Sequence, residues 1–338
     1  MVEPRTLITG VTGQDGAYMA KRLVDAGHKV FGGVWSETPD TWRLERLSVT
    51  RHIDFLPLDL SDDDTLSKSI AASRPDYVFN LGGLSSLGKT ERFPELTQQI
   101  NCDGPYALFK YAIESNALTR IFQASSAYVF GEAEEVPQTE TTPRHPATHY
   151  ARAKSRLDAH LADLRDAGRF AVSGILYNHE SPLRGDEFVT QKIVQALARI
   201  KAGSQETLEL GNLDSLRDWS YAADFIDGMC RTLAAKKPDT YVFASGTPHA
   251  VRDWLTIAAQ VLDLNLELRG QRVDETGYSH TLDRTIVRIN PSYYREETGE
   301  PPTGDSSKAR HLLNWQPQLS FDALVKRMTI AAQSRVGV

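Results

Sequence analysis

A tyrosine and a lysine stand four residues apart in the middle of the chain, at Tyr150 and Lys154. This spacing places both side chains on one face of a helix. A nearby ammonium favours phenolate over phenol, so a group with an ordinary pKa of about 10 can exchange a proton with an alcohol. Taken alone, such a pair is more often an exposed tyrosine beside a solvated lysine. Ser125 and Ser126 favour the catalytic interpretation, because they end a predicted strand and supply a hydroxyl that polarises the reacting C–O bond.

A glycine-rich turn near the start of the chain has the features of a phosphate-binding loop. It follows an apolar strand at residues 6–9, contains Gly10, Gly13 and Gly16, and opens a helical pattern over residues 17–26. Gly10 permits the tight turn, Gly13 lets backbone amides approach a pyrophosphate, and Gly16 allows close packing of helix on sheet. The helix N-terminus then offers unsatisfied N–H groups and the positive end of its dipole. This context predicts a dinucleotide site rather than a turn without a ligand. The predicted contacts in the turn also include Thr12, Gln14 and Asp15.

Short apolar strands alternate with helical patterns through the first half of the chain. The predicted strands lie at residues 29–34, 53–56, 77–81, 120–124 and 171–176 besides the first one, and a strand at 241–244 returns to the same sheet. Alternation of this kind predicts an α/β fold of Rossmann type, a doubly wound parallel sheet with helices on both faces. Ligands of such sheets bind at the carboxyl ends of the strands.

Residues that follow three of these strands are therefore predicted to line the cofactor site. They are Trp35 and Ser36 after the second strand, Asp59 and Leu60 after the third, and Leu81, Gly82 and Gly83 at the end of the fourth. Two interpretations of Asp59 stay open: a contact to the adenine end of the cofactor, and the N-cap of the helix that follows.

Length, charge and cysteine content narrow the class of protein. The 338 residues carry a formal net charge of −6, which argues against a nucleic acid or an anionic membrane as partner. Cys102 and Cys230 show no metal-ligand spacing and are expected to be buried, reduced thiols, so no metal site is predicted. Neither a signal peptide nor a membrane-spanning run is recognised, since charges occur early, at Glu3 and Arg5. These observations predict a cytoplasmic enzyme.

The strand–helix alternation loosens after Tyr177. We predict an NAD-binding Rossmann domain made of residues 1–177 and 219–250, and a smaller, discontinuous α/β substrate lobe made of residues 178–218 and 251–338. The last segment is expected to hold two helices and a long, proline-containing loop.

The glycine turn, the strand-end serine and the Tyr-x-x-x-Lys pair together resemble the extended short-chain dehydrogenase/reductases, which act on nucleotide sugars with a bound nicotinamide cofactor. Further runs are similar to the GDP-mannose 4,6-dehydratase branch of that group. These runs are residues 8–16, 174–182, 188–190, 210–214 and 217–219, so the resemblance extends over nearly the whole chain.

The resemblance implies a GDP-linked sugar as substrate and a role for individual residues. Tyr150 would be the base, Ser126 would orient the sugar hydroxyl, and Lys154 would lower the pKa of Tyr150 and hold the nicotinamide ribose. Further cofactor contacts would be Tyr177 and His179, and the substrate contacts would be Ser85, Ser86, Ser126, Asn178, Val189, Lys192, Leu210, Gly211, Asn212, Arg217 and Arg295. The cations of this set suit a diphosphate, which arginine binds bidentately.

Departures from the branch change the expected reaction. Its dehydratases carry an acidic residue two positions after the catalytic hydroxyl, whereas here Ser126 is followed by Ala127 and Tyr128. Without that carboxylate, elimination loses a general acid/base, typically about a hundredfold or more in rate. The run at 125–131 instead resembles nucleotide-sugar 4-epimerases. Small residues at 82–86 leave room for a hexose or a longer sugar.

The predicted cofactor is NAD rather than NADP. The branch places two arginines after the second strand and a third in its Val-Thr-Arg run, where this chain has Trp35, Ser36 and Gln191. These arginines are the residues suited to a 2′-phosphate. Arg43 is the one nearby cation that could reach the ribose end instead.

The sequence thus predicts an NAD-dependent epimerase that oxidises a GDP-linked sugar at a ring hydroxyl, C4 by preference, and re-reduces it on the other face. Tyr128 is either a second acid/base or a pocket-lining residue. The alternatives are a GDP-4-keto-sugar reductase, a dehydratase that uses Glu132 or Glu134, and a non-catalytic nucleotide-sugar sensor. By resemblance, helices at 94–115 and 147–164 would form a homodimer. A tetramer is less expected, because the loop at Trp35 lacks the arginines that relatives use for it.

Overall fold

The computed structural model describes residues 3–132, 134–297 and 300–337. Its strands are β1 (Arg5–Thr9), β2 (Lys29–Val34), β3 (Ile53–Pro57), β4 (Tyr77–Asn80), β5 (Arg120–Ser126), β6 (Ala171–Leu176), β7 (Asn178–Glu180), β8 (Leu208–Leu210), β9 (Leu216–Tyr221), β10 (Thr240–Phe243), β11 (Pro248–Ala250), β12 (Leu266–Arg269), β13 (Thr276–Ser279) and β14 (Arg284–Ile289). Its α-helices are α1 (Gln14–Asp25), α2 (Trp42–Arg46), α3 (Asp63–Ser73), α4 (Leu87–Arg92), α5 (Pro94–Gln98), α6 (Gly104–Ser115), α7 (His149–Asp166), α8 (Val189–Lys201), α9 (Ala222–Ala234), α10 (Val251–Val261), α11 (Ser307–Leu313) and α12 (Phe321–Val336). Short 3₁₀ turns are η1 (Thr50–His52), η3 (Ala127–Phe130) and η4 (Arg272–Asp274), and η2 (Gln99–Asp103) is a π-helical turn.

Contacts divide the chain into two compact units. The first unit comprises Met1–Tyr177, Ala222–Phe243 and Gly304–Gln316, and the second comprises Asn178–Tyr221, Ala244–Thr303 and Pro317–Val338. Residues 304–316, in the last third of the chain, belong to the first unit. There α11 packs against α9 and β10 of the first unit. The proline-containing loop before α11 has no strand pattern. The local sequence therefore does not predict that α11 contacts the first unit.

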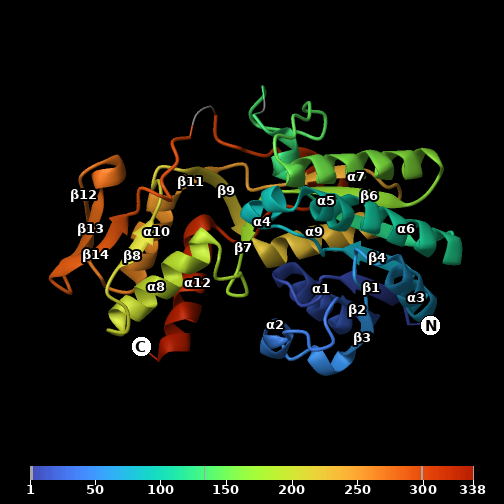
Figure 1. The fold of residues 1–338 in the computed structure, drawn as a ribbon, viewed down its shortest axis with the longest axis horizontal. Helices are drawn as coiled ribbons and strands as arrows, with labels where there is room; N and C mark the ends of the chain where they lie inside the picture. Colours follow the sequence, from blue (N-terminus) through green and yellow to red (C-terminus); the bar gives the residue numbers. More distant parts are fainter. Residues whose placement is uncertain (1–2, 133, 298–299, 338) are drawn as a thin grey trace. The chain divides into compact units, whose positions relative to one another are not determined.

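The first unit is built on a seven-stranded sheet in the order β10-β6-β5-β4-β1-β2-β3 (Figure 1). Every pairing in this sheet is parallel. Its strands are mostly buried because they are apolar on both faces, as parallel sheets covered by helices require. The Rossmann-type fold predicted from the alternation of strands and helices is confirmed.

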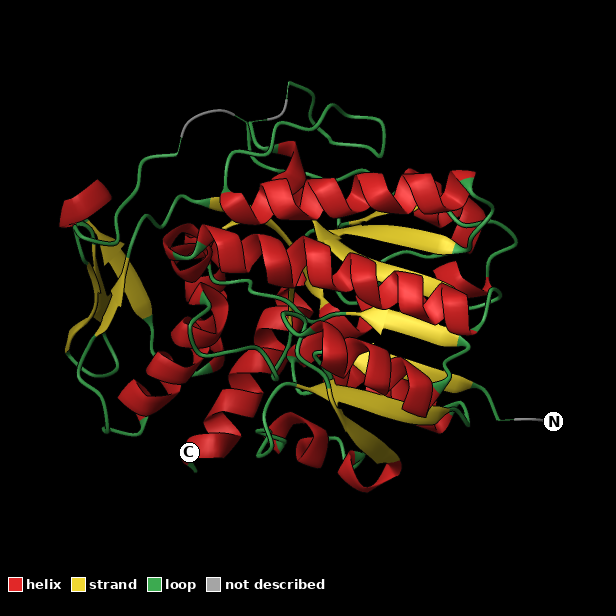
Figure 2. Cartoon of the chain, turned by 45° about the vertical axis from the view of Figure 1, so that its right-hand side comes forward, coloured by secondary structure: helices red, strands yellow, loops and turns green. Residues whose placement is uncertain are grey.

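Helices cover both faces of this sheet (Figure 2). On one face α3, α6 and α7 pack side by side over a core that includes Leu66, Leu108 and Leu157. On the other face α1 packs against α9. Because strands run parallel, their carboxyl ends all meet at one edge, where β1, β4 and β5 lead into the glycine turn, the Gly82-Gly83 segment and Ser126.

The second unit contains two small sheets. One has the order β11-β9-β7 and the other β12-β13-β14-β8. The helices α8, α10 and α12 pack together over a core that includes Trp219, Trp254 and Leu324.

The prediction of two helices and a loop for the last segment was wrong. Three helices and the strands β12, β13 and β14 lie there. These strands are short and only half-buried, and β14 pairs in parallel with β8, which lies far earlier in the sequence. Local pattern carries little signal for strands whose stability comes from such distant pairing.

The two cysteines form no disulfide. Cys102 is buried as expected, whereas Cys230 is only partly buried. Burial raises the pKa of each thiol to about 12, so both stay protonated at neutral pH. Among the described residues, no cluster of His, Cys, Asp and Glu could hold a metal ion, and no helix is long and apolar enough to cross a membrane.

Candidate active site

Helix α7 carries both members of the Tyr-x-x-x-Lys pair. The helix begins at His149, and Thr148 caps it by accepting a hydrogen bond from the amide of Ala151 over 3.1 Å. Tyr150 therefore lies in the first turn and Lys154 one turn later. The ammonium nitrogen of Lys154 lies 5.8 Å from the centroid of the Tyr150 ring. The structure thus brings the predicted base and its lysine together.

Lys154 is buried, with 5% of its surface exposed. Its Nζ donates a hydrogen bond of 2.8 Å to the carbonyl oxygen of Ala124 on β5. Burial lowers the pKa of Lys154 to about 8, although the nearby Asp158 acts in the opposite direction. The lysine therefore changes its charge close to physiological pH. Its burial is not consistent with the alternative in which Lys154 is a solvated surface lysine.

Ser126 ends β5 and starts the 3₁₀ turn η3. Its Oγ accepts a hydrogen bond of 3.3 Å from the amide of Tyr128. A serine hydroxyl that accepts from a backbone amide can still donate its own proton. Tyr128 is 44% exposed, and its ring meets that of Tyr150 edge-on, with centroids 6.2 Å apart. The four predicted catalytic residues all belong to the first unit.

The glycine turn packs so closely against neighbouring backbone atoms that two of its glycines have no room for a side chain. Gly10 has φ +65°, and a Cβ there would lie 2.7 Å from the Cα of Gly82. A Cβ on Gly16 would overlap the carbonyl of Gly10 and lie 2.6 Å from the Cα of Val11. Gly13 is the N-cap of α1 and provides no side-chain hydrogen bond to the helix. Such a helix start suits a diphosphate, so the turn fits the dinucleotide expected from the sequence.

The residues after β2 form the predicted ribose end. Trp35 is 82% exposed, and Ser36 accepts a hydrogen bond from the amide of Thr38. Arg43 stacks on the ring of Trp42, 4.5 Å from its centroid, and donates to the carbonyl of Thr12 over 3.3 Å. This arginine therefore lies against the glycine turn.

Asp59 does not cap the helix that follows β3. Its carboxylate accepts hydrogen bonds from the amide and hydroxyl of Ser61, while Asp62 caps α3 by accepting from the amide of Asp64. The N-cap interpretation of Asp59 was therefore wrong by three residues, because the chain makes one more turn before the helix begins. Leu60, beside it, is buried.

Asn101 is a residue that the sequence analysis missed. It is buried in the π-helical turn η2, accepts a hydrogen bond from the amide of Leu84 and donates one to the carbonyl of the same residue, both over 3.0 Å. These bonds hold the chain just after Gly83. Near the other end of the segment, the amide of Gly82 donates to Thr9 Oγ1 over 3.0 Å, and Leu81 directly follows β4. An isolated asparagine in a helical pattern carried no signal for this contact.

The remaining predicted contacts in the first unit differ in accessibility. Tyr177 is buried and donates its hydroxyl proton to Gln138, whereas Ser85 and Ser86 are exposed just before α4. Glu132 and Glu134, the alternative carboxylates for dehydration, are exposed in the segment that follows η3.

The predicted substrate residues of the second unit sit at element ends. Asn178 begins β7, Val189 begins α8, Leu210 ends β8, and Gly211 and Asn212 follow it. His179, which was predicted to contact the cofactor, is the middle residue of β7. The ammonium of Lys192 lies 4.9 Å from the centroid of the Tyr293 ring. Asn212 donates a hydrogen bond of 3.1 Å to the carbonyl of Arg295.

Arg217 has a carboxylate partner in the same unit. It binds Glu297 with both of its terminal nitrogens, over 2.9 and 2.6 Å. Partial burial acts to raise the pKa of Glu297, but the hydrogen bonds and the charge of Arg217 outweigh it and lower that pKa. Arg217 is therefore held in a bidentate geometry, and the anion that it binds here is a carboxylate of the chain itself.

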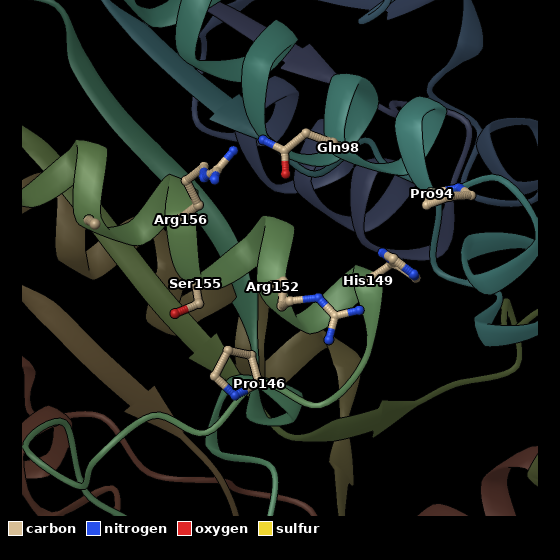
Figure 3. Close-up of a pocket in the computed structure, with 8 residues that line it drawn as sticks. Pro94, Gln98, Pro146, His149, Arg152, Ser155 and Arg156 are labelled. Atoms are coloured by element: carbon tan, nitrogen blue, oxygen red, sulfur yellow. The ribbon is translucent and has the colours of Figure 1, made fainter.

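A pocket of about 580 Å³ lies between α5 and α7, and none of the residues that line it is a predicted site residue (Figure 3). It is lined by Pro94, Gln98, Pro146, His149, Arg152, Ser155, Arg156 and Ala159. Arg152 and Arg156 make it basic. The predicted dimer helices carry this pocket.

Comparisons with known proteins identify the group to which the chain belongs. A family model described as GDP-mannose 4,6 dehydratase matches residues 7–328. The chain belongs to the GDP-mannose 4,6-dehydratase family. It is 36% identical to GDP-mannose 4,6 dehydratase 2 of Arabidopsis thaliana over 97% of this chain and 87% of that protein. It is 35% identical to GDP-mannose 4,6-dehydratase of Yersinia enterocolitica over 96% and 92%, respectively.

Solved structures agree on the fold. A UDP-glucose 4-epimerase from Thermotoga maritima has a TM-score of 0.82 at 19% identity, covering 98% of this chain and 99% of the other. A UDP-glucose 4-epimerase from Thermus thermophilus has a TM-score of 0.80 at 20% identity, covering 99% and 100%. The family match confirms the resemblance inferred from the sequence, and this member of the GDP-mannose 4,6-dehydratase family is an enzyme of the extended short-chain dehydrogenase/reductase type.

Proposed function

We propose that this family member is an NAD-dependent epimerase that inverts C4 of a GDP-linked sugar. The proposal depends mainly on the identity of the η3 residue that contacts Tyr150. That neighbour is the phenol of Tyr128, in T-shaped contact, and not a carboxylate. Transient oxidation of an alcohol needs one proton acceptor beside the reacting hydroxyl, whereas elimination of water needs a second acid/base for carbon-bound hydrogen. The group beside Tyr150 suits the first reaction better.

The proton in this reaction is handled by Tyr150. As phenolate, Tyr150 removes the proton of the sugar hydroxyl, and Ser126 donates a hydrogen bond that orients the same oxygen. Lys154, 5.8 Å from the ring centroid, stabilises the phenolate through its charge. Bound NAD⁺ would accept the hydride from the carbon and return it to the other face. Tyr150 then gives the proton back to the sugar oxygen. Because the hydride also returns to the sugar, the reaction causes no net oxidation.

The glycine turn and the loop after β2 support NAD as the cofactor. The turn accommodates a diphosphate, and neutral Trp35 and Ser36 follow the strand. A 2′-phosphate would meet one cation near the turn, Arg43, which already contacts Trp42 and Thr12. Neutral surroundings favour the ribose hydroxyl of NAD.

The nucleotide part of the substrate is proposed to bind to residues of the second unit. Relatives over the whole chain are named for GDP-mannose. Arg217 would bind the diphosphate after releasing Glu297, with Lys192 and Arg295 as further cations. The other proposed contacts are Asn178, Val189, Leu210, Gly211 and Asn212.

A GDP-mannose 4,6-dehydratase activity is the second candidate, because the family match favours it. The carboxylates available to replace the missing acidic residue, Glu132 and Glu134, are exposed in the segment after η3. Exposed carboxylates with ordinary solvation are poor bases for a carbon-bound proton. This feature makes dehydration the less favoured reaction.

The deciding experiment is incubation of the purified protein with a panel of GDP-sugars in deuterated water, followed by mass spectrometry and NMR. A product of unchanged mass, an inverted C4 centre and no need for added cofactor are expected. A product lighter by one water supports the dehydratase instead. A product that gains two hydrogens at the expense of NAD(P)H makes the protein a 4-keto-sugar reductase.

We also propose a homodimer formed through α5, α6 and α7. Charges on these helices support it: Arg152 and Arg156 are exposed on α7, while Glu95 on α5 and Asp103 on η2 are exposed nearby. A two-fold arrangement would pair the basic side of one copy with the acidic side of the other. Light scattering should give twice the chain mass, and Arg152→Glu with Arg156→Glu should give a monomer.

A further inference from the structure

The buried ammonium of Lys154 raises a physical problem. It lies against β5, and its hydrogen bond goes to a neutral acceptor, the carbonyl of Ala124. A carbonyl oxygen satisfies one N–H group but carries no net charge to offset the loss of water. Without an anion nearby, burial would drive the lysine toward its neutral form, in which it cannot stabilise a phenolate.

Asp158 lies one further turn along the same face of α7, at i+4 from Lys154. Only 2% of its side chain is exposed. Its carboxylate accepts a hydrogen bond of 2.6 Å from Ser125 Oγ, one from Ser173 Oγ, and a charge-assisted bond of 2.6 Å from Arg144. Three donors on two oxygens are the surroundings of an ionised carboxylate.

The network of Asp158 reaches the proposed reaction centre by two routes. Through space, its negative charge acts on Lys154 along the helix face. Through bonds, it holds Ser125, the residue directly before Ser126 at the end of β5. Removing the carboxylate would therefore alter both a charge and the anchorage of the strand end.

Several other titratable or charged groups of the described residues face this network. Tyr150 lies one turn before Lys154 on α7, and Cys102 approaches from η2 with a thiol that stays protonated. Arg144 contacts Asp158 from the segment before α7. Arg165 is close enough that Asp158 raises its pKa and Arg144 lowers it. Asp158 and Arg144 are thus the pair of opposite charges that can tune Lys154.

We propose that Asp158 is a positioning residue whose buried carboxylate keeps Lys154 protonated beside Tyr150, and that Arg144 sets how strongly it does so. The catalytic consequence rests on the proposed function, but the electrostatic coupling does not. Asp158 touches no reacting atom. It acts through Lys154 and, by way of Ser125, through the end of β5.

The test measures the titration of Lys154 directly, by NMR of the full chain with ¹³C-labelled lysine, with the signal assigned from Lys154→Arg. In the unaltered protein a midpoint near pH 8 is expected. Asp158→Asn keeps the shape and most hydrogen bonds but removes the charge, so the midpoint should fall by about one pH unit. Arg144→Gln leaves the carboxylate unneutralised, so the midpoint should rise by about half a unit. Asp163→Asn, at an exposed residue of the same helix, is the matched control and should change nothing.

The opposite signs separate electrostatics from mere loss of packing. Loosening of the helix would admit water and move the midpoint upward in both variants. An unchanged or raised midpoint in Asp158→Asn overturns the proposal, and so does a downward shift in Arg144→Gln. If Asp158→Asn fails to fold, Arg144→Gln is compared with Arg144→Lys, which keeps the positive charge. The midpoint should rise in Arg144→Gln and stay unchanged in Arg144→Lys, and an equal midpoint in the two variants overturns the proposal.

Activity provides the second readout. If the proposed function is right, the alkaline limb of the pH–rate profile should move with the NMR midpoint in each variant. If the NMR midpoint shifts but the alkaline limb of the pH–rate profile does not, the electrostatic coupling of Asp158 to Lys154 is supported. The catalytic role of Lys154 is then refuted.

Discussion

The ring of Tyr128 meets the ring of Tyr150 edge-on, with 6.2 Å between centroids and 83° between planes. Tyr150 comes from α7 and Tyr128 from η3, the turn that Ser126 caps. The serine therefore fixes the turn that brings the second phenol to the first. This contact distinguishes two reactions, because a phenol and a carboxylate at the same position would serve different proton transfers.

Replacing Tyr150 by Phe should reduce turnover of the GDP-sugar by about a hundredfold or more, since the variant loses the only proposed proton acceptor. Cofactor binding and thermal stability should change little. Steady-state assays by NMR, with cofactor fluorescence, check both expectations. Tyr111→Phe is the control, because the hydroxyl of that half-buried residue donates its hydrogen bond to Asp63 and not to a residue of the site. Retained turnover in Tyr150→Phe would mean that another group is the proton acceptor and that the role proposed for Tyr150 is wrong.

Replacing Tyr128 by Phe distinguishes pocket lining from acid/base chemistry. The ring contact with Tyr150 survives the substitution and only the hydroxyl is lost. We expect turnover to stay within about fivefold of the unaltered enzyme, well short of the hundredfold loss typical of a missing acid/base. A loss of that larger size would assign Tyr128 a proton-transfer role.

Lys154 should make the stability of the fold depend on pH in the alkaline range. Its pKa is about 8 in the folded chain against an ordinary value of 10.5. Between these values the unfolded chain binds more protons than the folded one, so the free energy of unfolding rises with pH. Below pH 8 the full penalty of a buried charge applies. Lys154→Met removes this pH-dependent contribution to the free energy of unfolding.

The measurement for this prediction is urea unfolding of both proteins at pH 7.5 and pH 9.5. The unaltered protein should gain about 2 kcal/mol relative to Lys154→Met over that interval, from a shift of this size. A constant difference between the two proteins would mean that the lysine is not perturbed by burial. Activity should fall over the same range, because a neutral lysine cannot stabilise the phenolate.

Replacing Gly16 by Ala should weaken dinucleotide binding. The added methyl group would overlap the carbonyl of Gly10 and approach the Cα of Val11 to 2.6 Å, so α1 must shift away from the turn. Calorimetric titration with NAD should show at least about a tenfold weaker Kd, equivalent to about 1.4 kcal/mol. Gly88→Ala is the matched control, because a Cβ there meets no atom within 4 Å. Equal weakening by both variants would contradict a specific role for the turn.

Replacing Ser36 by Arg should shift cofactor preference toward NADP. The substitution places a cation after β2, where the exposed Trp35 leaves room for a long side chain. We expect about a tenfold gain in NADP affinity with little change for NAD. Arg43→Ala in the same assay should weaken NADP more than NAD. If the unaltered protein already binds NADP more tightly, the proposed cofactor is wrong.

Much of the first unit could be predicted because its signals are local. The strands β1 to β6 agree with the predicted ranges to within about two residues, since each is a short apolar run bounded by polar or turn residues. The glycine turn and the Tyr-x-x-x-Lys pair could also be predicted. Each is formed by residues that are close together in the sequence, in one backbone turn and in one turn of α7. The family could be inferred from the same segments.

Tertiary structure alone decided the charges around these residues. The bond from Ser125 to Asp158 spans 33 positions, and the pair of Arg217 with Glu297 spans 80. The burial that lowers the pKa of Lys154 comes from packing of α7 on β5, and no spacing along one helix reveals it. Sequence by itself determined which groups could do chemistry, whereas folding determined their charge, because desolvation and ion pairing depend on residues far apart in the chain.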